Sequence, residues 1–207
     1  MVRSQSSRRW LQRHVADPFV RRAREAGYRS RAAFKLLEID DRERLLRQGA
    51  KVVDLGAAPG GWSQVAAERV KPGGRVIAVD LLEIAPISGV TVLRGDFCAA
   101  AVEEAVVAAL GGGKADVVLS DLSPNLSGIA SADQARTAVL LRGAIAFCRR
   151  QLKPGGAFLA KVFQGEEFAS VLTALKAVFR EVRTRKPAAS RGESRETYLL
   201  ARGLIEP

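Results

Sequence analysis

The sequence predicts an α/β protein built around a mostly parallel sheet. Short apolar runs alternate with segments in which apolar residues recur every three or four positions, a pattern typical of parallel strands joined by helices. Residues 52–64 place a buried strand, a glycine-rich turn and a helix start next to one another. The sequence Lys-Pro-Gly-Gly, which ends helices, occurs twice and each time precedes a predicted strand. The length of 207 residues suits one domain with its own core.

Six strands are predicted in chain order. The first runs directly into the glycine turn, and the polar stretch Arg183–Glu193 is expected to form a loop before the last strand. The strands are Lys51–Leu55, Arg75–Leu81, Thr91–Leu93, Asp116–Ser120, Ala157–Phe163 and Thr197–Ala201.

Two of the predicted helices have clear ends. The helix after the glycine turn stops at residues 71–74, and one of its faces carries Trp62, Val65, Ala66 and Val70. A longer helix begins with a capping box over Ser131–Gln134, in which the serine and glutamine side chains would satisfy unpaired N–H groups. It stops at residues 153–156, and its apolar positions recur at spacings of three and four: Ala138, Leu141, Ile145, Cys148 and Leu152.

Positive charge is concentrated at the N-terminal end of the chain. The formal net charge is +11; residues 1–34 hold nine arginines against Asp17 and Glu25, which gives +7 there and leaves +4 for the other 173 residues. Arginine binds phosphate through a planar pair of donors, and such clusters are typical of nucleic-acid binding. The alternative is a basic surface that only keeps the protein in solution. The nine are Arg3, Arg8, Arg9, Arg13, Arg21, Arg22, Arg24, Arg29 and Arg31.

The composition argues against several classes of protein. No run of about 18 apolar residues is present, so no membrane span is predicted, and the N-terminal residues lack the apolar stretch of a signal peptide. They are rich in Arg and Ser, as transit peptides are, but we favour a folded segment because a distinct motif begins by Arg29. Cys98 and Cys148 lack zinc-type spacing and His14 is the sole histidine, so neither a metal site nor a histidine-based triad is expected.

The glycine turn indicates the kind of ligand. A phosphate-binding P-loop would need lysine directly after Gly61, the second glycine of the pair that begins with Gly56, but Trp62 stands there. A dinucleotide fingerprint would need glycine two residues after Gly56, where the chain has Ala58 followed by Pro59. A nucleoside with a zwitterionic tail and no phosphates fits instead, and S-adenosylmethionine is such a molecule. The alternative is a strand-to-helix turn that binds no ligand.

Acidic residues lie at the ends of three predicted strands, where open α/β sheets bind ligands. Asp80 ends the second strand and suits a carboxylate that accepts hydrogen bonds from ribose hydroxyls. Asp96 follows the third strand and could accept from an adenine amino group. Asp121 ends the fourth strand, and Lys161 lies within the fifth. Any one of these aspartates could instead cap a helix, but several at consecutive strand ends favour a binding site.

Seven segments spread over nearly the whole chain carry a resemblance to a known family. They are Arg29–Leu36, Asp54–Gln64, Asp80–Leu82, Gly95–Phe97, residues 120–125, Lys161–Gly165 and Ser194–Tyr198. In these segments the chain resembles the FtsJ-type RNA ribose 2′-O-methyltransferases, above all the bacterial members that act on large-subunit ribosomal RNA. The resemblance implies a Rossmann-like class I S-adenosylmethionine-dependent methyltransferase: a mostly parallel seven-stranded sheet with an antiparallel last strand and helices on both faces. We expect a methyltransferase domain over residues 35–207, with residues 1–34 as a basic RNA-binding extension packed on it.

The resemblance also implies site residues. The catalytic Lys-Asp-Lys-Glu group of the family falls on Lys35, Asp121, Lys161 and Glu196, the last preferred to Glu193 because it precedes Thr-Tyr. The residues expected to bind the cofactor are Gly56, Gly60, Trp62, Asp80, Asp96 and Asp121. Those expected to contact RNA, beside Lys35, are Arg8, Arg9, Arg13, Arg29 and Arg31. Ala33 departs from the pattern, because some relatives are expected to have an aromatic residue there.

Lys161 has two chemically reasonable roles. A ribose hydroxyl is a poor nucleophile, so its oxygen must be aligned with the sulfonium methyl group and must lose its proton. Lys161 would either accept that proton as a neutral general base, or stay charged and orient the oxygen while water takes the proton. Lys35 and the sulfonium favour the neutral form of Lys161, whereas Asp121 and Glu196 favour the charged form.

From the resemblance we expect a cytoplasmic monomer that acts on a uridine in the peptidyl-transferase region of large-subunit ribosomal RNA within a ribosomal particle, with no metal and no membrane contact. Three other interpretations fit the sequence less well. A silent RNA-binding module would not need the Lys-Asp-Lys-Glu group, and a small-molecule methyltransferase would not need the arginine-rich N-terminal region. An NAD enzyme would need the glycine that is missing from the turn.

Overall fold

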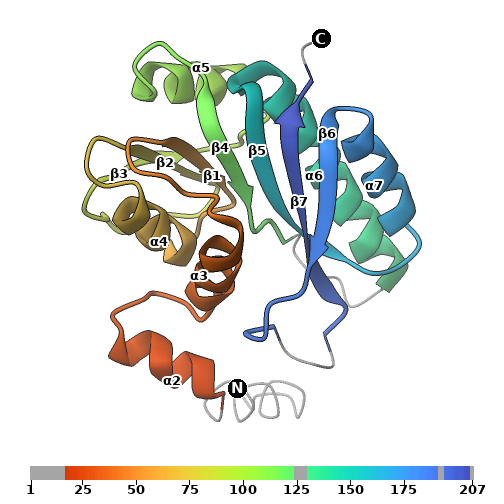
Figure 1. Ribbon diagram of the computed structural model, residues 1–207, viewed down its shortest axis with the longest axis horizontal. Helices are drawn as coiled ribbons and strands as arrows, with labels where there is room; N and C mark the ends of the chain where they lie inside the picture. Colours follow the sequence, from red (N-terminus) through yellow and green to blue (C-terminus); the bar gives the residue numbers. More distant parts are fainter. Residues whose placement is uncertain (1–16, 124–129, 191–193, 206–207) are drawn as a thin grey trace, which may run out of the picture.

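A single sheet of seven strands forms the centre of the molecule. The computed structural model describes residues 17–123, 130–190 and 194–205, except for the side chains of residues 130–132. Within these residues the strand order is β3-β2-β1-β4-β5-β7-β6, with helices on both faces of the sheet (Figure 1). The pairs from β3 to β5 are parallel, and β7 is antiparallel to both of its neighbours. The expected Rossmann-like sheet with a reversed last strand is thereby confirmed.

All six predicted strands are present, with shifts at their ends. β5 begins at Leu152, which pairs with Ala115, so residues 153–156 belong to this strand and do not simply separate it from the preceding helix. The strands are β1 (Lys51–Leu55), β2 (Arg75–Asp80), β3 (Val90–Arg94), β4 (Ala115–Ser120), β5 (Leu152–Phe163), β6 (Phe179–Arg185) and β7 (Glu196–Leu204).

The helices are α2 (Pro18–Glu25), α3 (Ala32–Glu43), α4 (Gly61–Arg69), α5 (Ala100–Ala109), α6 (Ala130–Gln151) and α7 (Phe168–Lys176). The expected apolar faces of α4 and α6 are buried, but Leu152, which was expected on the long helix, is the first residue of β5. The expected capping box is wrong, because α6 already begins at Ala130 and the Gln134 Oε1 atom accepts from the backbone N–H of Glu166 (3.3 Å). The expected boundary between residues 34 and 35 falls inside α3. No helix in the described part of the chain is both long enough and apolar enough to span a membrane.

The sheet divides the core into two layers. One layer packs α6 and α7 on the sheet, and the other packs α3 and α4 on the opposite face, which we call the α3 face. Leu159 and Tyr198 belong to the α3 face. Because alternate residues of a strand point to the same side, Lys161 and Glu196, each two positions away, point to the α3 face as well.

The expectation that Arg183–Glu193 forms a loop is wrong for its first residues, because Arg183 and Arg185 belong to the edge strand β6. Both pair across to β7 at positions on the α3 face. There the buried carboxylate of Glu43, at the end of α3, contacts Arg185 Nε at 2.6 Å and Arg183 Nη1 at 3.7 Å. Burial alone raises the pKa of Glu43, but the hydrogen bond and charge of Arg185, with the charges of Arg183 and Arg202, lower it below its usual value. The arginines of β6 thus hold α3 on the sheet through ion pairs with Glu43.

We predict that Glu43→Gln lowers the free energy of unfolding at neutral pH by about 1–2 kcal/mol, because it leaves the partly buried guanidinium groups of Arg185 and Arg202 without their anion, whereas Arg183 keeps Glu181. A carboxylate with a lowered folded-state pKa stabilises the fold above its unfolded-state pKa of about 4.3, and this stabilisation is lost as pH falls through the lower folded-state pKa. Urea unfolding should therefore show a difference between wild type and Glu43→Gln that disappears in acid. Glu104→Gln, an exposed change on α5, is the control, and an equal loss in both variants would contradict the assignment.

Candidate functional site

Two neighbouring cavities open where β1, β2 and β4 end. The larger has a volume of about 510 Å³ and the smaller about 170 Å³, and both are lined by Gly56 and Ala58 of the glycine turn. Asp80 and Asp96 line the larger one together with apolar side chains that include Leu81, Leu82, Phe97 and Leu122. The smaller one is lined by Asp54, Pro59, Trp62 and Asp121. The carboxyl ends of these strands thus carry a large, partly apolar hollow beside a smaller one that Asp54 and Asp121 line.

Two positions in the turn require glycine. Gly56 has a φ of 72°, and a Cβ atom there would lie 2.5 Å from Leu122 Cδ2. Gly60, the residue before α4, has a φ of 110°, and a Cβ atom would lie 2.5 Å from Ile87 Cδ1. Side chains are strained in this left-handed region, and the close neighbours add a steric cost. The turn therefore lies tightly against the two segments that complete the cavity walls.

The two aspartates expected to bind a nucleoside are held by the backbone. Asp80 accepts from the N–H of Ala58 with Oδ2 and from that of Leu82 with Oδ1, both at 2.8 Å. Asp96 accepts from the N–H of Cys98 with Oδ1 at 2.9 Å. A carboxylate oxygen can accept more than one hydrogen bond, so both groups are fixed in place and keep capacity for a ligand in the cavity that they line.

Asp54 was not predicted as a site residue, yet it is fully buried and lines the smaller cavity. Its Oδ2 atom accepts from Ser63 Oγ at 2.6 Å, whereas Oδ1 is buried without a hydrogen-bond partner among the described residues. Burial, reinforced by the charges of Asp121 and Asp80, raises the pKa of Asp54 to about 7 against the opposing hydrogen bond from Ser63. A carboxylate within the apolar run Val52–Leu55 was the available signal, because a buried charge needs a partner.

Lys161 and Asp121 form one ion pair of the site. Their side chains lie 3.0 Å apart, from Lys161 Nζ to Asp121 Oδ1, and Nζ also donates to the backbone oxygen of Asp121 at 2.9 Å. The strand register explains the contact, because Ala160 pairs with Ser120 and the next residues of the two strands are Lys161 and Asp121. The Lys161 side chain is only 9% exposed, and the Asp121 carboxylate is the anion beside it.

Lys35 and Glu196 form the second ion pair, with Nζ 2.6 Å from Oε1. The same oxygen accepts from Ser190 Oγ at 3.0 Å and from Tyr198 Oη at 2.9 Å. Burial alone raises the pKa of Glu196, but the charge and hydrogen bond of Lys35, the hydrogen bond of Tyr198 and the charge of Lys161 lower it below its usual value. Glu196 therefore stays ionised and lies within electrostatic reach of both lysines.

Other expected site residues have contacts within the chain. Trp62 is almost fully buried, donates from Nε1 to the Ala32 carbonyl at 2.9 Å and packs on Tyr198. Arg31 pairs with Asp17 and donates to the Ala189 carbonyl. Arg29 donates to three backbone carbonyls. Residues outside the described part of the chain are Arg8, Arg9, Arg13 and Glu193.

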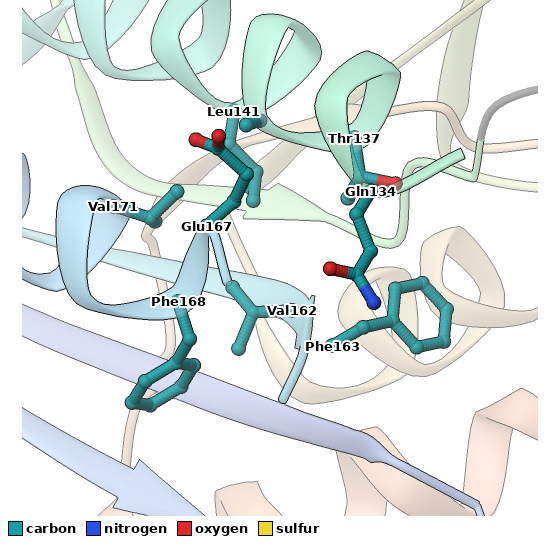
Figure 2. A pocket seen from close by; sticks show the side chains of 9 residues that line it. Gln134, Thr137, Leu141, Val162, Phe163, Glu167, Phe168 and Val171 are labelled. Carbon is teal, nitrogen blue, oxygen red and sulfur yellow. The ribbon is translucent and has the colours of Figure 1, made fainter. Parts of the chain in front are cut away.

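A further hollow lies between α6, α7 and the end of β5, and it is lined mainly by apolar side chains such as Val162, Phe163 and Phe168 (Figure 2). Its volume is about 10 Å³, which is room for about one water molecule. It is a packing gap beneath the helices that cover the face opposite to α3. Among the described residues, no group of three or more His, Cys, Asp or Glu side chains is placed to hold a metal ion.

The comparisons with known proteins agree with each other. A sequence model described as "FtsJ-like methyltransferase" matches residues 28–204. Two relatives carry the name ribosomal RNA large subunit methyltransferase E: one from Azoarcus, 54% identical over 97% of this chain and 98% of its own, and one from Nitrosospira multiformis, 53% identical over 98% of both.

Solved structures are similar as well. A Plasmodium falciparum protein described as a ribosomal RNA methyltransferase has a TM-score of 0.79 at 29% identity, over 87% of this chain and all of that chain. Fibrillarin from Aeropyrum pernix, solved with S-adenosyl-L-methionine, has a TM-score of 0.56 at 18% identity, over 84% of this chain and 75% of that chain, which is a likeness of fold.

Proposed function

The chain belongs to the FtsJ-like methyltransferase family, and we propose that it transfers the methyl group of S-adenosylmethionine to the 2′-hydroxyl of a uridine ribose in large-subunit ribosomal RNA. The proposal rests on one observation: a buried lysine lies close to a cavity large enough for a nucleoside. Asp121 lines the smaller cavity and pairs with Lys161, so the cofactor pocket and the lysine share one residue.

The two cavities fit the parts of S-adenosylmethionine. The carboxylates of Asp80 and Asp96 would accept from the ribose hydroxyls and the adenine amino group, and the apolar walls would hold the adenine ring. In the smaller cavity the unpartnered oxygen of Asp54 would accept from the ammonium group of the methionine tail. Gly56, Gly60 and Trp62 would shape the passage between the two. When bound, S-adenosylmethionine supplies an electrophilic methyl group on its sulfonium.

Lys161 would bind and orient the ribose oxygen. A lysine ammonium has three donors, and Lys161 uses one of them for the carbonyl oxygen of Asp121, so donors remain for a hydroxyl oxygen. Because Lys161 Nζ lies against the carboxylate and donates to the carbonyl of Asp121, we propose the orienting role rather than the general-base role. The proton would then leave to water. Positioning of this kind supplies much of the acceleration in a group transfer.

Lys35 would hold the substrate beside Lys161. Glu196, which accepts from Ser190 and Tyr198, fixes the Lys35 ammonium group on the α3 face, where an RNA backbone entering the site would meet a positive charge. Residues 1–34 would extend this surface, with Arg8, Arg9 and Arg13 as phosphate contacts. The name of the relatives supports large-subunit ribosomal RNA as the substrate. We propose that the protein acts on this RNA within a ribosomal particle in the cytoplasm.

The proposal is tested by incubating the protein and labelled S-adenosylmethionine with large ribosomal subunits from a strain that lacks this activity. We expect labelled RNA with one alkali-resistant linkage, since a 2′-O-methyl group blocks cleavage of the neighbouring phosphodiester. Label on a base, with every linkage still cleaved by alkali, would refute ribose methylation. Absence of label on the RNA would refute large-subunit ribosomal RNA as the substrate.

We predict that Lys161→Ala lowers turnover by at least about a hundredfold, because the ribose oxygen loses its orienting donor. Affinity for S-adenosylhomocysteine, the demethylated product, should stay within a few-fold of wild type. Lys176→Ala, an exposed change at the end of α7, should leave both quantities unchanged. A wild-type pH–rate profile with an ionisation that vanishes in Lys161→Ala would instead support the general-base role.

We predict that affinity for S-adenosylhomocysteine rises about fivefold between about pH 6 and pH 7.5, as Asp54 ionises through its raised pKa of about 7 and pairs with the ligand ammonium. Affinity should fall again above about pH 8, because the ammonium group loses its proton. Asp54→Asn should bind more weakly and without the rise. Calorimetry at several pH values measures this, and a rise that persists in Asp54→Asn would rule out the contact.

A further inference from the structure

The segment before α3 is fastened along α4, the helix that begins at the glycine turn, on the same side of the sheet (Figure 1). The side chain of Gln64 makes two of the contacts: Oε1 accepts from the N–H of Arg29 at 2.8 Å, and Nε2 donates to the carbonyl of Gly27 at 3.0 Å. Tyr28 Oη donates to Glu68 Oε2 at 2.8 Å. These three contacts fix the backbone of Arg29 beside the turn.

The guanidinium group of Arg29 connects two loops. Nη1 donates to the Pro59 carbonyl at 3.2 Å and to the Ala85 carbonyl at 2.6 Å, and Nη2 donates to the Pro86 carbonyl at 2.6 Å. Pro59 belongs to the glycine turn, whereas Ala85 and Pro86 belong to the segment between β2 and β3. The planar pair of donors matches two successive carbonyls, which a lysine ammonium would not do.

Both loops are walls of the cavities. Pro59 lines the smaller cavity, and Leu81 and Leu82, at the start of the segment between β2 and β3, line the larger one. The loops also touch through apolar contacts: Ile84 is buried against Ala57, and Ile87 packs on the same small cluster. This cluster is small, so apolar contact alone gives little to hold the two walls together.

We propose that Arg29 is a positioning residue for the cofactor pocket, which clamps the glycine turn to the segment between β2 and β3 and so holds both walls in the shape that binds S-adenosylmethionine. The inference rests on the proposed function for the identity of the ligand. A pocket that is already in its binding shape avoids the entropic cost of ordering two loops on binding. Arg29 acts through the loops and needs no contact with RNA.

The inference is tested by comparing Arg29→Met with Arg24→Met, which removes the same charge from an exposed position on α2. Calorimetry with S-adenosylhomocysteine measures cofactor affinity, and filter binding with ribosomal RNA measures RNA affinity. We expect Arg29→Met to weaken S-adenosylhomocysteine binding about tenfold, whereas Arg24→Met leaves it within about twofold of wild type. RNA affinity should change equally in the two variants.

Arg29→Lys keeps the charge but not the planar pair of donors, and it provides a milder second variant should Arg29→Met fail to fold. We expect its affinity for S-adenosylhomocysteine to lie between wild type and Arg29→Met, with a raised KM for S-adenosylmethionine and an unchanged kcat at saturation. Wild-type cofactor affinity in Arg29→Lys and Arg29→Met, with lowered RNA affinity, would overturn the clamp and make Arg29 an RNA contact. If the wild-type protein itself did not bind S-adenosylhomocysteine, the proposed function would fail first.

Discussion

A buried ammonium group needs an anion held at a fixed distance, and the ion pair between Lys161 and Asp121 meets that need at the centre of the candidate site. The pair exists because β4 and β5 are in a register that brings these two residues opposite each other. The same register directs Lys161 to the α3 face, where Lys35 arrives on a helix and Glu196 on the reversed strand β7. The two cavities and the two ion pairs thus lie together where the parallel strands end.

The sequence was sufficient for the parts of this arrangement that depend on local chemistry. The glycine turn, the strand-end aspartates and the alternation of strands and helices are each visible within a few residues. β6 was missed because Arg183 and Arg185 resemble loop residues until Glu43, far away in sequence, is known to pair with them. Asp54 was not predicted, because only the folded structure shows that its Oδ1 atom is buried without a hydrogen-bond partner among the described residues. The pairing of Lys35 with Glu196, across most of the chain, was accessible only through resemblance to a family.

The charge of the N-terminal region has more than one use. Several of its arginines already have partners within the chain. Arg31 pairs with Asp17 and donates to the Ala189 carbonyl, and Arg29 donates to three other carbonyls. Arg22 lies over the rings of Phe19 and Phe34. Part of the positive charge therefore holds the segment on the domain, and the charge that reaches a nucleic acid is smaller than the composition indicates.

The reversal of β7 has a practical consequence for handling the protein. Its first residue, Glu196, pairs with Phe163 at the edge of the sheet that carries the site, and its last, Leu204, pairs with Phe179 at the opposite edge. The N-terminal helices α2 and α3 lie toward the edge that carries the site (Figure 1). A fluorescent label attached at the end of β7 would therefore lie far from the candidate site, whereas one attached on α2 would lie on the same side of the molecule as the site.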